Sequence, residues 1–442
     1  MIFSLLKEKK LFSGSIFRLF IMLAFFSTLL SCSTTFTPGT SRRIPEDFFG
    51  MAHAGDTRTE EEYELLDDLS AVWMRKTFRW NQIEETEGAW DFERWDDFVD
   101  SGKAAGKKIL AVLAYDVGWI YGEDVEARRH IIPEKIPYFL RYVEEVVLRY
   151  KGRIDAYEIW NEPNWTFWRG PNKDFYELSR AAAEKIREID PEAYIIAASV
   201  SRVPKGFIKG MFKAGAMDQA DAISFHPYAV SPKASVRLFD KLEKIVKEFG
   251  FTGDIWITEV GYPTKGWYPT RVSEKNFPAY VVKTLTGHAA RGVKVLFWYE
   301  LFDKYNKGEA PSKLDSELYF GLAYPDYARK DGAAAYALCG KYIAGTDYRP
   351  DLVTKTGLPS SAQVLLFCGS SAQTLVLWNE GGSVPVKVSL SGTQHLVHDI
   401  ASGGFQTVSA ETELVLTKTP VILTWTADAS GEAAQQIEVI KR

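Results

Sequence analysis

The sequence predicts an α/β fold, a (β/α)8 TIM barrel followed by a small C-terminal antiparallel β-sandwich. Eight short apolar runs alternate with polar or amphipathic segments through the middle of the chain, as strands and helices do in a closed barrel. With 442 residues and 46% hydrophobic composition, the chain can bury a large core. After about residue 345, strand-like runs separated by Gly- and Ser-rich turns replace the helical pattern.

The first residues predict export from the cytoplasm. A basic start precedes an apolar stretch at 19–30, which has the length of a signal-peptide core and is short for a membrane span. The stretch ends in the letters LLSC, which resemble a bacterial lipobox. We therefore expect a lipoprotein signal peptide at 1–31, a lipid on Cys32, a flexible tether at 32–45 and a location in the cell envelope, anchored to a membrane. An ordinary secretory signal or an uncleaved anchor is the alternative.

The barrel is expected at residues 46–345. The predicted strands are 48–54, 72–78, 108–115, 154–162, 194–200, 222–228, 255–261 and 293–301, and the predicted helices are 95–105, 138–150, 175–189, 236–249 and 280–290. Helical spacing is clearest in the second helix, where Phe139, Val143, Val146 and Val147 fall on one face. An open doubly wound sheet is the alternative, but it needs a ligand motif at its switch point that the sequence does not contain.

The C-terminal sandwich is expected at residues 350–426, followed by a loose polar tail at 427–442. Its predicted strands are 362–368, 374–379, 384–390, 395–400 and 413–424. Packing against the barrel is the expected role. Sugar binding is the less favoured alternative, because only Trp378 and Trp425 stand out there as aromatic residues.

Charge and cysteine content exclude several classes of function. A net charge of −5 with intermixed signs gives no basic stripe for nucleic acid. No Cys/His cluster has metal-ligand spacing and no glycine-rich phosphate loop follows a strand, so no cofactor or metal is implied. Cys339 and Cys368 are expected to be two unpaired buried thiols, although an exported protein allows a bridge between them. We expect a monomer.

Two glutamates carry the functional prediction. Glu162, in YEIWNEPN, and Glu259, in WITEVGYPT, each close an apolar run. Catalytic groups of barrel enzymes collect at the carboxyl ends of the strands, and two carboxylates there suffice to cleave a glycosidic bond. The structural alternatives are that Glu162 caps a helix after Pro163 and that Glu259 only pairs with Arg75.

Five segments in order resemble glycoside hydrolase clan A, whose members are retaining (β/α)8 glycosidases. They begin with WMRKTFRWNQIEETEGAWDFERWDDFVDSGKAAGKKIL and continue with YEIWNEPNWTFW, ISFHPYAV, WITEVGYPT and LFWYEL. The likeness spans roughly 48–345 and is greatest to family thirty-nine and bacterial exopolysaccharide hydrolases. It implies that Glu162 is the acid/base and Glu259 the nucleophile. One carboxyl must begin neutral to protonate the leaving oxygen, and the other must be ionised to attack the anomeric carbon.

The same resemblance implies supporting roles for residues around the two glutamates. Arg75 would supply positive charge near Glu259, and Tyr228, in the His226-x-Tyr228 pair, would donate to it. Asn161 would hydrogen-bond the sugar 2-hydroxyl, and Trp298 would form an apolar floor under the reacting sugar. Tyr115, followed by Asp116, stands where some members carry a histidine, so the donors around the sugar differ here.

The substrate is predicted only as a class. Aromatic residues cluster in the expected strand-to-helix loops, about half of them expected to contact sugar: Trp119, Tyr121, Trp165, Trp168, Trp267 and Tyr268. Arg169 and Lys265 nearby would tolerate an acidic glycan. We expect an endo-acting hydrolase of a β-linked extracellular polysaccharide. The alternatives are an exo-acting β-xylosidase or β-glucosidase, a transglycosylase with the same residues, and a non-catalytic glycan-binding lipoprotein.

Overall fold

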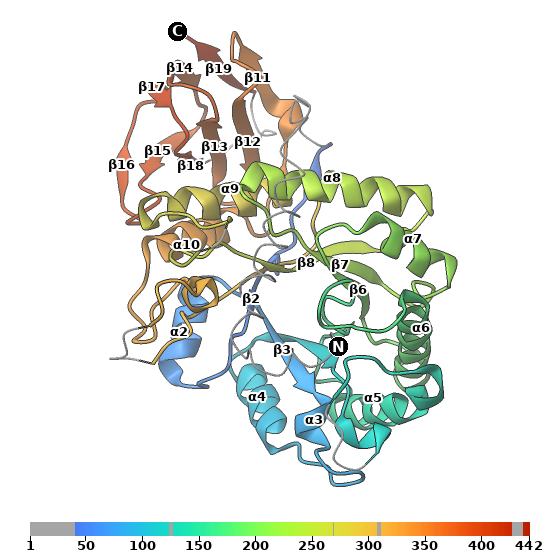
Figure 1. Ribbon diagram of the computed structural model, residues 1–442. Coiled ribbons are helices and arrows are strands. Elements are labelled where there is room, and N and C mark those ends of the chain that lie inside the picture. The colour runs from blue at the N-terminus through green and yellow to red at the C-terminus, as the bar shows by residue number, and fades with distance from the viewer. Residues whose placement is uncertain (1–39, 123–126, 268, 307–310, 427–435) are drawn as a thin grey trace, which may run out of the picture.

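The computed structural model describes residues 40–122, 127–267, 269–306, 311–426 and 436–442 (Figure 1). The predicted signal peptide, Cys32 and most of the predicted tether lie outside these residues. Among the described helices, none combines the length and the apolar character that a membrane span requires. The described residues begin at Thr40, shortly before the first barrel strand.

Eight parallel strands close into a barrel in sequence order, which confirms the predicted fold class (Figure 1). Every predicted strand has an observed counterpart in the same place. The strands are β2 (Phe49–Ala52), β3 (Trp73–Arg79), β4 (Lys108–Ala114), β5 (Ala156–Ile159), β6 (Ile195–Ser201), β7 (Ala222–His226), β8 (Asp254–Val260) and β9 (Leu296–Trp298).

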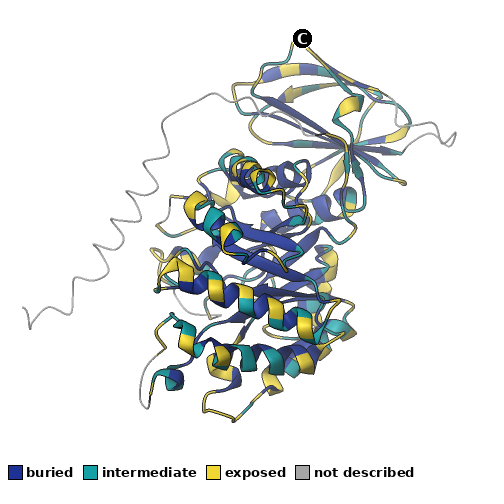
Figure 2. Ribbon diagram, turned by 90° about the vertical axis from the view of Figure 1, so that its right-hand side faces the viewer, coloured by how far each residue is buried: buried dark blue, intermediate teal, exposed yellow. Residues whose placement is uncertain are grey.

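Helices surround the barrel, and most of them carry exposed residues on their outer side and buried residues toward the strands (Figure 2). The five predicted helices correspond to α4 (Glu93–Ala104), α5 (Ile136–Tyr150), α6 (Asn172–Ile189), α8 (Pro232–Glu248) and α9 (Phe277–Ala289). The sequence did not predict α2 (Glu60–Asp68), α3 (Trp80–Ile83), α7 (Lys205–Lys213) or α10 (Asp331–Ile343). The first three are short, and α10 is rich in small residues, so each carries a weak periodic signal.

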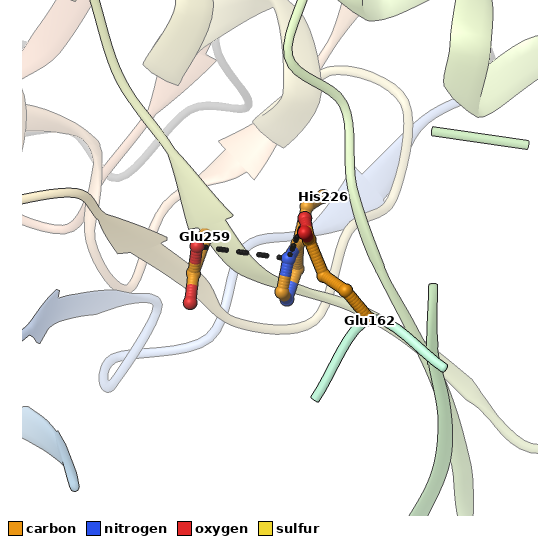
Figure 3. A group of neighbouring side chains, drawn as sticks. All are labelled: Glu162, His226 and Glu259. Carbon is orange, nitrogen blue, oxygen red and sulfur yellow. Dashed lines mark hydrogen bonds and ion pairs between the residues drawn. The ribbon is translucent and has the colours of Figure 1, made fainter. Parts of the chain in front are cut away.

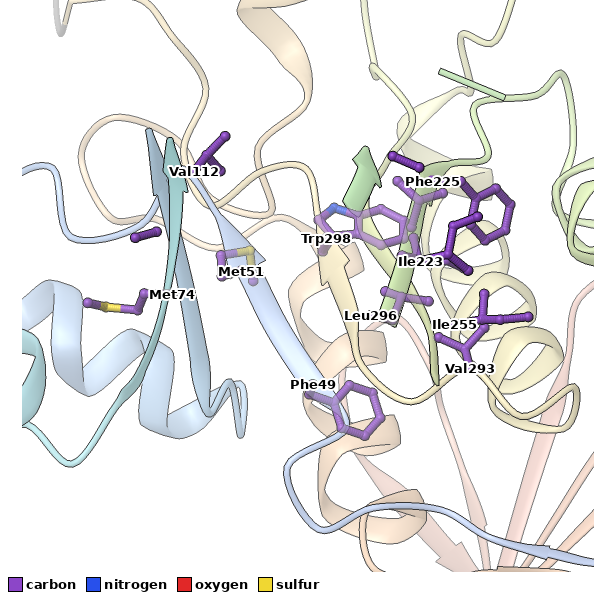
Figure 4. Close-up of a cluster of buried hydrophobic side chains, with 14 of the residues drawn as sticks. Phe49, Met51, Met74, Val112, Ile223, Phe225, Ile255, Val293, Leu296 and Trp298 are labelled. Atoms are coloured by element: carbon purple, nitrogen blue, oxygen red, sulfur yellow. The ribbon is translucent and has the colours of Figure 1, made fainter. Parts of the chain in front are cut away.

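The strands bury apolar side chains on both faces, but the inner face changes character along its length. Outside, the side chains of the strands pack against the helices (Figure 4). Inside, Trp73, Trp256 and Phe297 belong to an apolar cluster that fills the barrel. The carboxyl ends of the strands then bring buried polar side chains together, including Arg75 and Glu158. This polar layer supports the candidate site.

Two packed sheets form the C-terminal sandwich. One sheet has the order β1-β10-β12-β13-β18-β15-β16 and the other the order β11-β19-β14-β17, with an apolar core between them. The strands are β1 (Arg42–Arg43), β10 (Asp347–Tyr348), β11 (Val353–Thr356), β12 (Ala362–Cys368), β13 (Gln373–Asn379), β14 (Val384–Ser389), β15 (Thr393–His398), β16 (Phe405–Thr407), β17 (Glu411–Leu416), β18 (Val421–Thr426) and β19 (Ile437–Lys441).

Three predictions about the chain ends and the sandwich need correction. The predicted strand 413–424 is two strands, β17 and β18, separated by a turn. The predicted loose tail at 427–442 contains β19, which pairs with β14 and, in parallel, with β11. The predicted tether at 32–45 contains β1, which pairs with β10. Backbone pairing thus orders short polar segments that carry no strong apolar pattern.

The sandwich packs on the barrel through apolar and polar contacts, since Leu365, Phe367 and Val376 belong to the same buried cluster as the barrel. Lys283 of α9 pairs with Glu380 at 2.8 Å, and Thr374 Oγ1 donates to the carbonyl of Tyr342 at 3.1 Å. Trp378 and Trp425 are both buried, so neither offers an open ring face to a sugar. Cys339 and Cys368 are both free, as expected, but only Cys339 is buried and Cys368 is half-buried.

Candidate active site

Glu162 and Glu259 meet at the carboxyl end of the barrel. Glu259 lies on β8, and Glu162 follows β5, three strands away. Both side chains are largely buried. One carboxylate oxygen from each and a ring nitrogen of His226 all lie within 4.8 Å of one another (Figure 3). Carboxylate oxygens this close fit the short separation of a retaining glycosidase better than the longer one of an inverting enzyme.

The backbone holds Glu162 in an uncommon conformation. Its φ is +45° and that of Trp160 is +66°, in a region that side chains disfavour. The N–H of Glu162 donates to the carbonyl of Ser199 at 2.8 Å. No helix begins directly after Pro163; the next helix, α6, starts only at Asn172. The helix-cap alternative for Glu162 is therefore wrong, and strain at this position is typical of a functional residue.

Glu259 is surrounded by hydrogen-bond donors. Arg75 Nη1 donates to its Oε1 at 2.6 Å and Tyr228 Oη to its Oε2 at 3.0 Å. His226 Nδ1 lies 3.6 Å from the same Oε2. Burial raises the pKa of Glu259, but the charges of His226, Arg75 and His53 outweigh it and lower the pKa to about 2. Glu259 is therefore ionised at neutral pH.

A buried glutamate that the sequence prediction missed fixes Arg75. Glu158, on β5, accepts from Arg75 Nε at 2.7 Å, and Arg75 Nη2 donates to Asn161 Oδ1 at 2.8 Å. One guanidinium thus joins Glu158, Glu259 and Asn161. Because arginine only donates, Asn161 must present its oxygen to it, which leaves the amide hydrogens for Tyr115, its other partner, and for a ligand.

The tautomer of His226 follows from its neighbours. The Thr258 hydroxyl donates its only proton to Glu158 Oε1 at 2.7 Å. At 3.0 Å from Thr258 Oγ1, His226 Nε2 must therefore carry a hydrogen and donate it. His226 Nδ1 then faces Glu162 Oε1 at 2.9 Å, and a single proton fills the hydrogen bond between them. Burial lowers the pKa of His226, but Glu259 and Glu162 outweigh it and raise the pKa.

The three side chains of Figure 3 are also close enough to hold a metal ion. The charge around them opposes one. The Arg75 guanidinium already occupies Glu259 Oε1 at 2.6 Å, and His226 Nδ1 faces Glu162 across one shared proton. A cation would have to displace that proton and sit beside a fixed guanidinium, so the arrangement fits acid–base chemistry better than metal binding.

The structure places Trp298 away from the site, which corrects the predicted sugar floor. Its side chain is fully buried among apolar side chains (Figure 4). It packs against Phe277 of α9 and Tyr336 of α10. The next residue, Tyr299, lines the inside of the barrel instead, with its ring centroid 6.2 Å from that of Tyr228. Neighbouring strand residues point to opposite faces, so a shift of one residue exchanges the core position for the site position.

Tyr115 and the aromatic residues of the loops divide into three groups. Tyr115 lies in the site beside Asn161 and stacks on Phe167 at 5.6 Å; burial raises its pKa to about 12. Trp165 and Trp267 are exposed, at 46% and 51%. The other aromatic residues of the predicted cluster pack within loops or lie outside the described residues: Trp119, Tyr121, Trp168 and Tyr268.

Buried Trp168 donates to the carbonyl of Pro171 at 3.3 Å, and Trp119 donates to that of Glu84 at 3.0 Å. Both indole N–H groups are therefore satisfied inside the protein, and Trp168 has no open ring face. The predicted substrate contact is wrong for Trp168. Lys265, predicted to tolerate an acidic glycan, pairs with Glu274 at 3.4 Å.

Polar residues inside apolar strands are the signal that could have found the missed residues. Glu158 lies in AYEI, Ser224 in AISFH and Thr258 in DIWITEV. Ser224 Oγ and Thr258 Oγ1 donate to Glu158 Oε1 at 2.6 and 2.7 Å. A charged or hydroxyl side chain in a buried strand requires a partner, so several on neighbouring strands predict one network.

Comparison with known proteins shows likeness of structure. No protein-family model matches the chain, and no curated protein matches it. A family 39 glycoside hydrolase from the gut symbiont Bacteroides cellulosilyticus WH2 aligns with a TM-score of 0.70 at 19% identity, over 87% of this chain and 81% of that one.

Two further solved structures align over most of both chains. A monomeric β-xylosidase from Caulobacter crescentus CB15 has a TM-score of 0.61 at 14% identity, over 89% of this chain and 98% of that one. A GH30 endoxylanase from Clostridium papyrosolvens C71 has a TM-score of 0.61 at 14% identity, over 88% and 98%. At these identities the likeness is one of fold, and the chemistry rests on the site itself.

Proposed function

We propose that the protein is a retaining glycoside hydrolase that cleaves a β-linked polysaccharide. The observation that carries the proposal is the pair Glu162 and Glu259: two buried carboxylates with oxygens within 4.8 Å, in unequal surroundings. The architecture shared with solved glycoside hydrolases supports the same reaction class. Retention follows from the short separation, which suits direct attack by one carboxylate.

In the first step, a Glu259 oxygen attacks the anomeric carbon and a glycosyl ester forms while the glycosidic C–O bond breaks. Glu162 gives its proton to the departing oxygen. In the second step, Glu162 takes a proton from water, the water oxygen bonds to the anomeric carbon, and the ester bond to Glu259 breaks. If a sugar hydroxyl replaces water, the same residues carry out transglycosylation.

The supporting residues account for the division of labour. Arg75 and Tyr228 hold Glu259 ionised and oriented. His226 shares one proton with Glu162, so a proton is held beside the carboxyl group that is to donate it. Asn161, held by Arg75, is the candidate partner for the sugar 2-hydroxyl, a contact that strengthens in the transition state.

Endo action on a chain of several sugars is the form we favour. Exposed Trp165 follows Glu162 by one turn, and its backbone N–H donates to the Glu162 carbonyl at 3.0 Å. Exposed Trp267 lies on the loop after β8. Open aromatic faces beside the reaction centre suit more than one sugar ring. Exo-acting β-xylosidase or β-glucosidase activity is the second candidate, supported by the likeness to a β-xylosidase.

Anchoring to a membrane of the cell envelope is part of the proposal and rests on the LLSC letters that end in Cys32. Cys32→Ala should release the protein from the membrane fraction, and globomycin should block processing of the wild type. The anchor would be contradicted if the wild type were already in the soluble fraction, or if globomycin left its processing unchanged.

Product analysis on a panel of defined β-glycans and bacterial exopolysaccharides tests the reaction. We expect oligosaccharide products whose first-formed anomer is β. Proton NMR during the first turnovers identifies this anomer. An initial α-anomer would contradict the double displacement, and release of single sugars alone would favour the exo-acting alternative. Absence of cleavage of every β-glycan, together with glycan binding, would favour a non-catalytic binding protein.

A further inference from the structure

A basic cavity opens beside the reaction centre, between the ends of β2 and β3 and the start of α4. Its volume is about 160 Å³, well above what one water needs. Three of its lining residues are cations that the proposed mechanism does not use: Lys76, Arg79 and Arg94. The remaining lining includes His53 and Arg75 at the inner end and Asp56 as the one carboxylate.

The cations of this cavity outnumber its anions. Lys76 forms an ion pair with Asp56. Among the described residues, Arg79 and Arg94 have no ion pair with a carboxylate; Arg79 lies 5.6 Å from the centre of the Tyr115 ring. Arg75 is not available to a ligand, because it is already paired with Glu158 and Glu259. Two arginines therefore remain for a ligand.

The cations also act on one another. The Lys76 side chain is only 14% exposed. Burial and the positive charges of Arg94 and Arg79 lower the pKa of Lys76 to about 8. A bound anion would relieve this repulsion. Arg79 and Arg94 are themselves exposed, so an anion can reach them from solvent.

The cavity shares its inner wall with the site. Arg75 contacts Glu259 directly, and His53 packs edge-on against Tyr299 with ring centroids 5.3 Å apart. On the other side, Arg79 covers Tyr115, which hydrogen-bonds Asn161. A group bound to Arg79 and Arg94 would thus belong to the sugar at the reaction centre or to its neighbour.

We propose that this cavity binds the carboxylate or sulfate of an acidic glycan, so that the substrate is an anionic polysaccharide. The planar guanidinium groups of Arg79 and Arg94 suit carboxylate and sulfate oxygens, and Lys76 adds a third positive charge. The inference rests on the proposed hydrolase function and names its substrate class. It assigns recognition to this cavity and not to Arg169 and Lys265, which lie on the loops after β5 and β8.

A matched pair of ligands tests the proposal. A trisaccharide of β-1,4-linked glucuronic acid and cellotriose differ only at C6, where one carries a carboxylate and the other a hydroxymethyl group. Calorimetry on Glu162→Gln, in which turnover is strongly slowed, should give about tenfold or more tighter binding of the uronate, the value of one added hydrogen bond between charged groups. Inorganic sulfate should compete with the uronate for the same cavity.

Two double variants with the same change in charge locate the site. In the Glu162→Gln background, Arg79→Ala with Arg94→Ala should remove the preference for the uronate and the competition by sulfate. Arg169→Ala with Lys265→Ala should leave both. Equal affinity for the two trisaccharides, or no binding of either trisaccharide or of sulfate, would overturn the proposal, as would loss of preference only in the second variant.

Turnover separates this proposal from the one on which it rests. Wild-type hydrolysis of β-glycans without any preference for acidic ligands would refute the cavity assignment and leave the hydrolase function standing. Preference for the uronate with no hydrolysis of any acidic or neutral β-glycan would refute the hydrolase function instead.

Discussion

The ends of β5 and β8 present the same side chain in opposite electrostatic settings. On β8, Glu259 accepts from Arg75 and Tyr228, both within 3.0 Å, so fixed donors stabilise its charge. After β5, Glu162 has one hydrogen-bond partner among the described side chains, His226, with which it shares a proton. The difference teaches that neighbours assign the roles: one carboxylate is held as an anion, and the other is held beside a proton.

Removing the charge at β8 should have the largest effect. Glu259→Gln keeps the size of the side chain but loses the attacking carboxylate, and we expect kcat to fall by about 10⁴-fold or more, as for other covalent catalysts. Hydrolysis of aryl β-glycosides measures it, with circular dichroism as the control for folding. Retention of more than a tenth of the activity by a folded variant would refute the nucleophile assignment.

The β5 end should respond differently to the nature of the leaving group. Glu162→Ala removes the proton donor, and we expect kcat/KM for natural β-glycans to fall by about 10²–10⁴-fold. Activated aryl glycosides, whose leaving groups need little protonation, should lose much less. The comparison is internal to one variant, so misfolding would lower both rates alike. Equal losses on both substrates would remove the distinction between the two strand ends.

The fold and the two strand-end glutamates could be predicted from the sequence because both follow local patterns. Eight apolar runs fix the strands, and a polar residue at the end of such a run lies at the barrel mouth. The face on which a residue lies is harder to predict near a strand end. Trp298 and Tyr299 exchange roles on a shift of one residue, and only the packing of Trp298 against Phe277 and Tyr336 decides which is inside.

The polar layer beneath the site could not be predicted, because its contacts join distant strands. Arg75 and Glu158 are 83 residues apart, and Thr258 and Glu158 are 100 apart. Each of these residues has an ordinary structural interpretation within its own strand. Only closure of the barrel brings them together, so the network that orients both carboxylates is a property of the tertiary fold.

A smaller effect is expected from weakening the donors on β8. Tyr228→Phe removes the hydroxyl that donates to Glu259 Oε2, and a hydrogen bond to a charged group is worth about 1.5–3 kcal/mol. We expect kcat to fall by about 10–100-fold. Tyr336→Phe, which removes a buried hydroxyl bonded to the carbonyl of Gly50 at 2.9 Å, is the matched control. It should lower stability and leave kcat unchanged; equal losses of kcat would point to packing and not to charge.

The smallest expected effect tests whether the β5 end depends on its shared proton. Thr258→Val removes the acceptor of His226 Nε2–H, whereas Ser224→Ala removes another donor to Glu158 without touching His226. Both should lose about 1–3 kcal/mol of stability. Because the pKa of His226 is raised, its contribution to stability is present below its unfolded pKa and is lost as pH rises through the folded pKa. The proton shared with Glu162 is lost over the same rise in pH.

The alkaline limb of kcat/KM should therefore lie above the ordinary histidine pKa, and Thr258→Val should move it to lower pH by about 0.5–1 unit, since the charged imidazole loses a hydrogen bond. Ser224→Ala should leave the limb in place. The acid limb should not move in either variant, because Arg75 and Tyr228 still hold Glu259 ionised. A shift of the acid limb alone would mean that the two strand ends are coupled through Glu158, and not separated as their surroundings indicate.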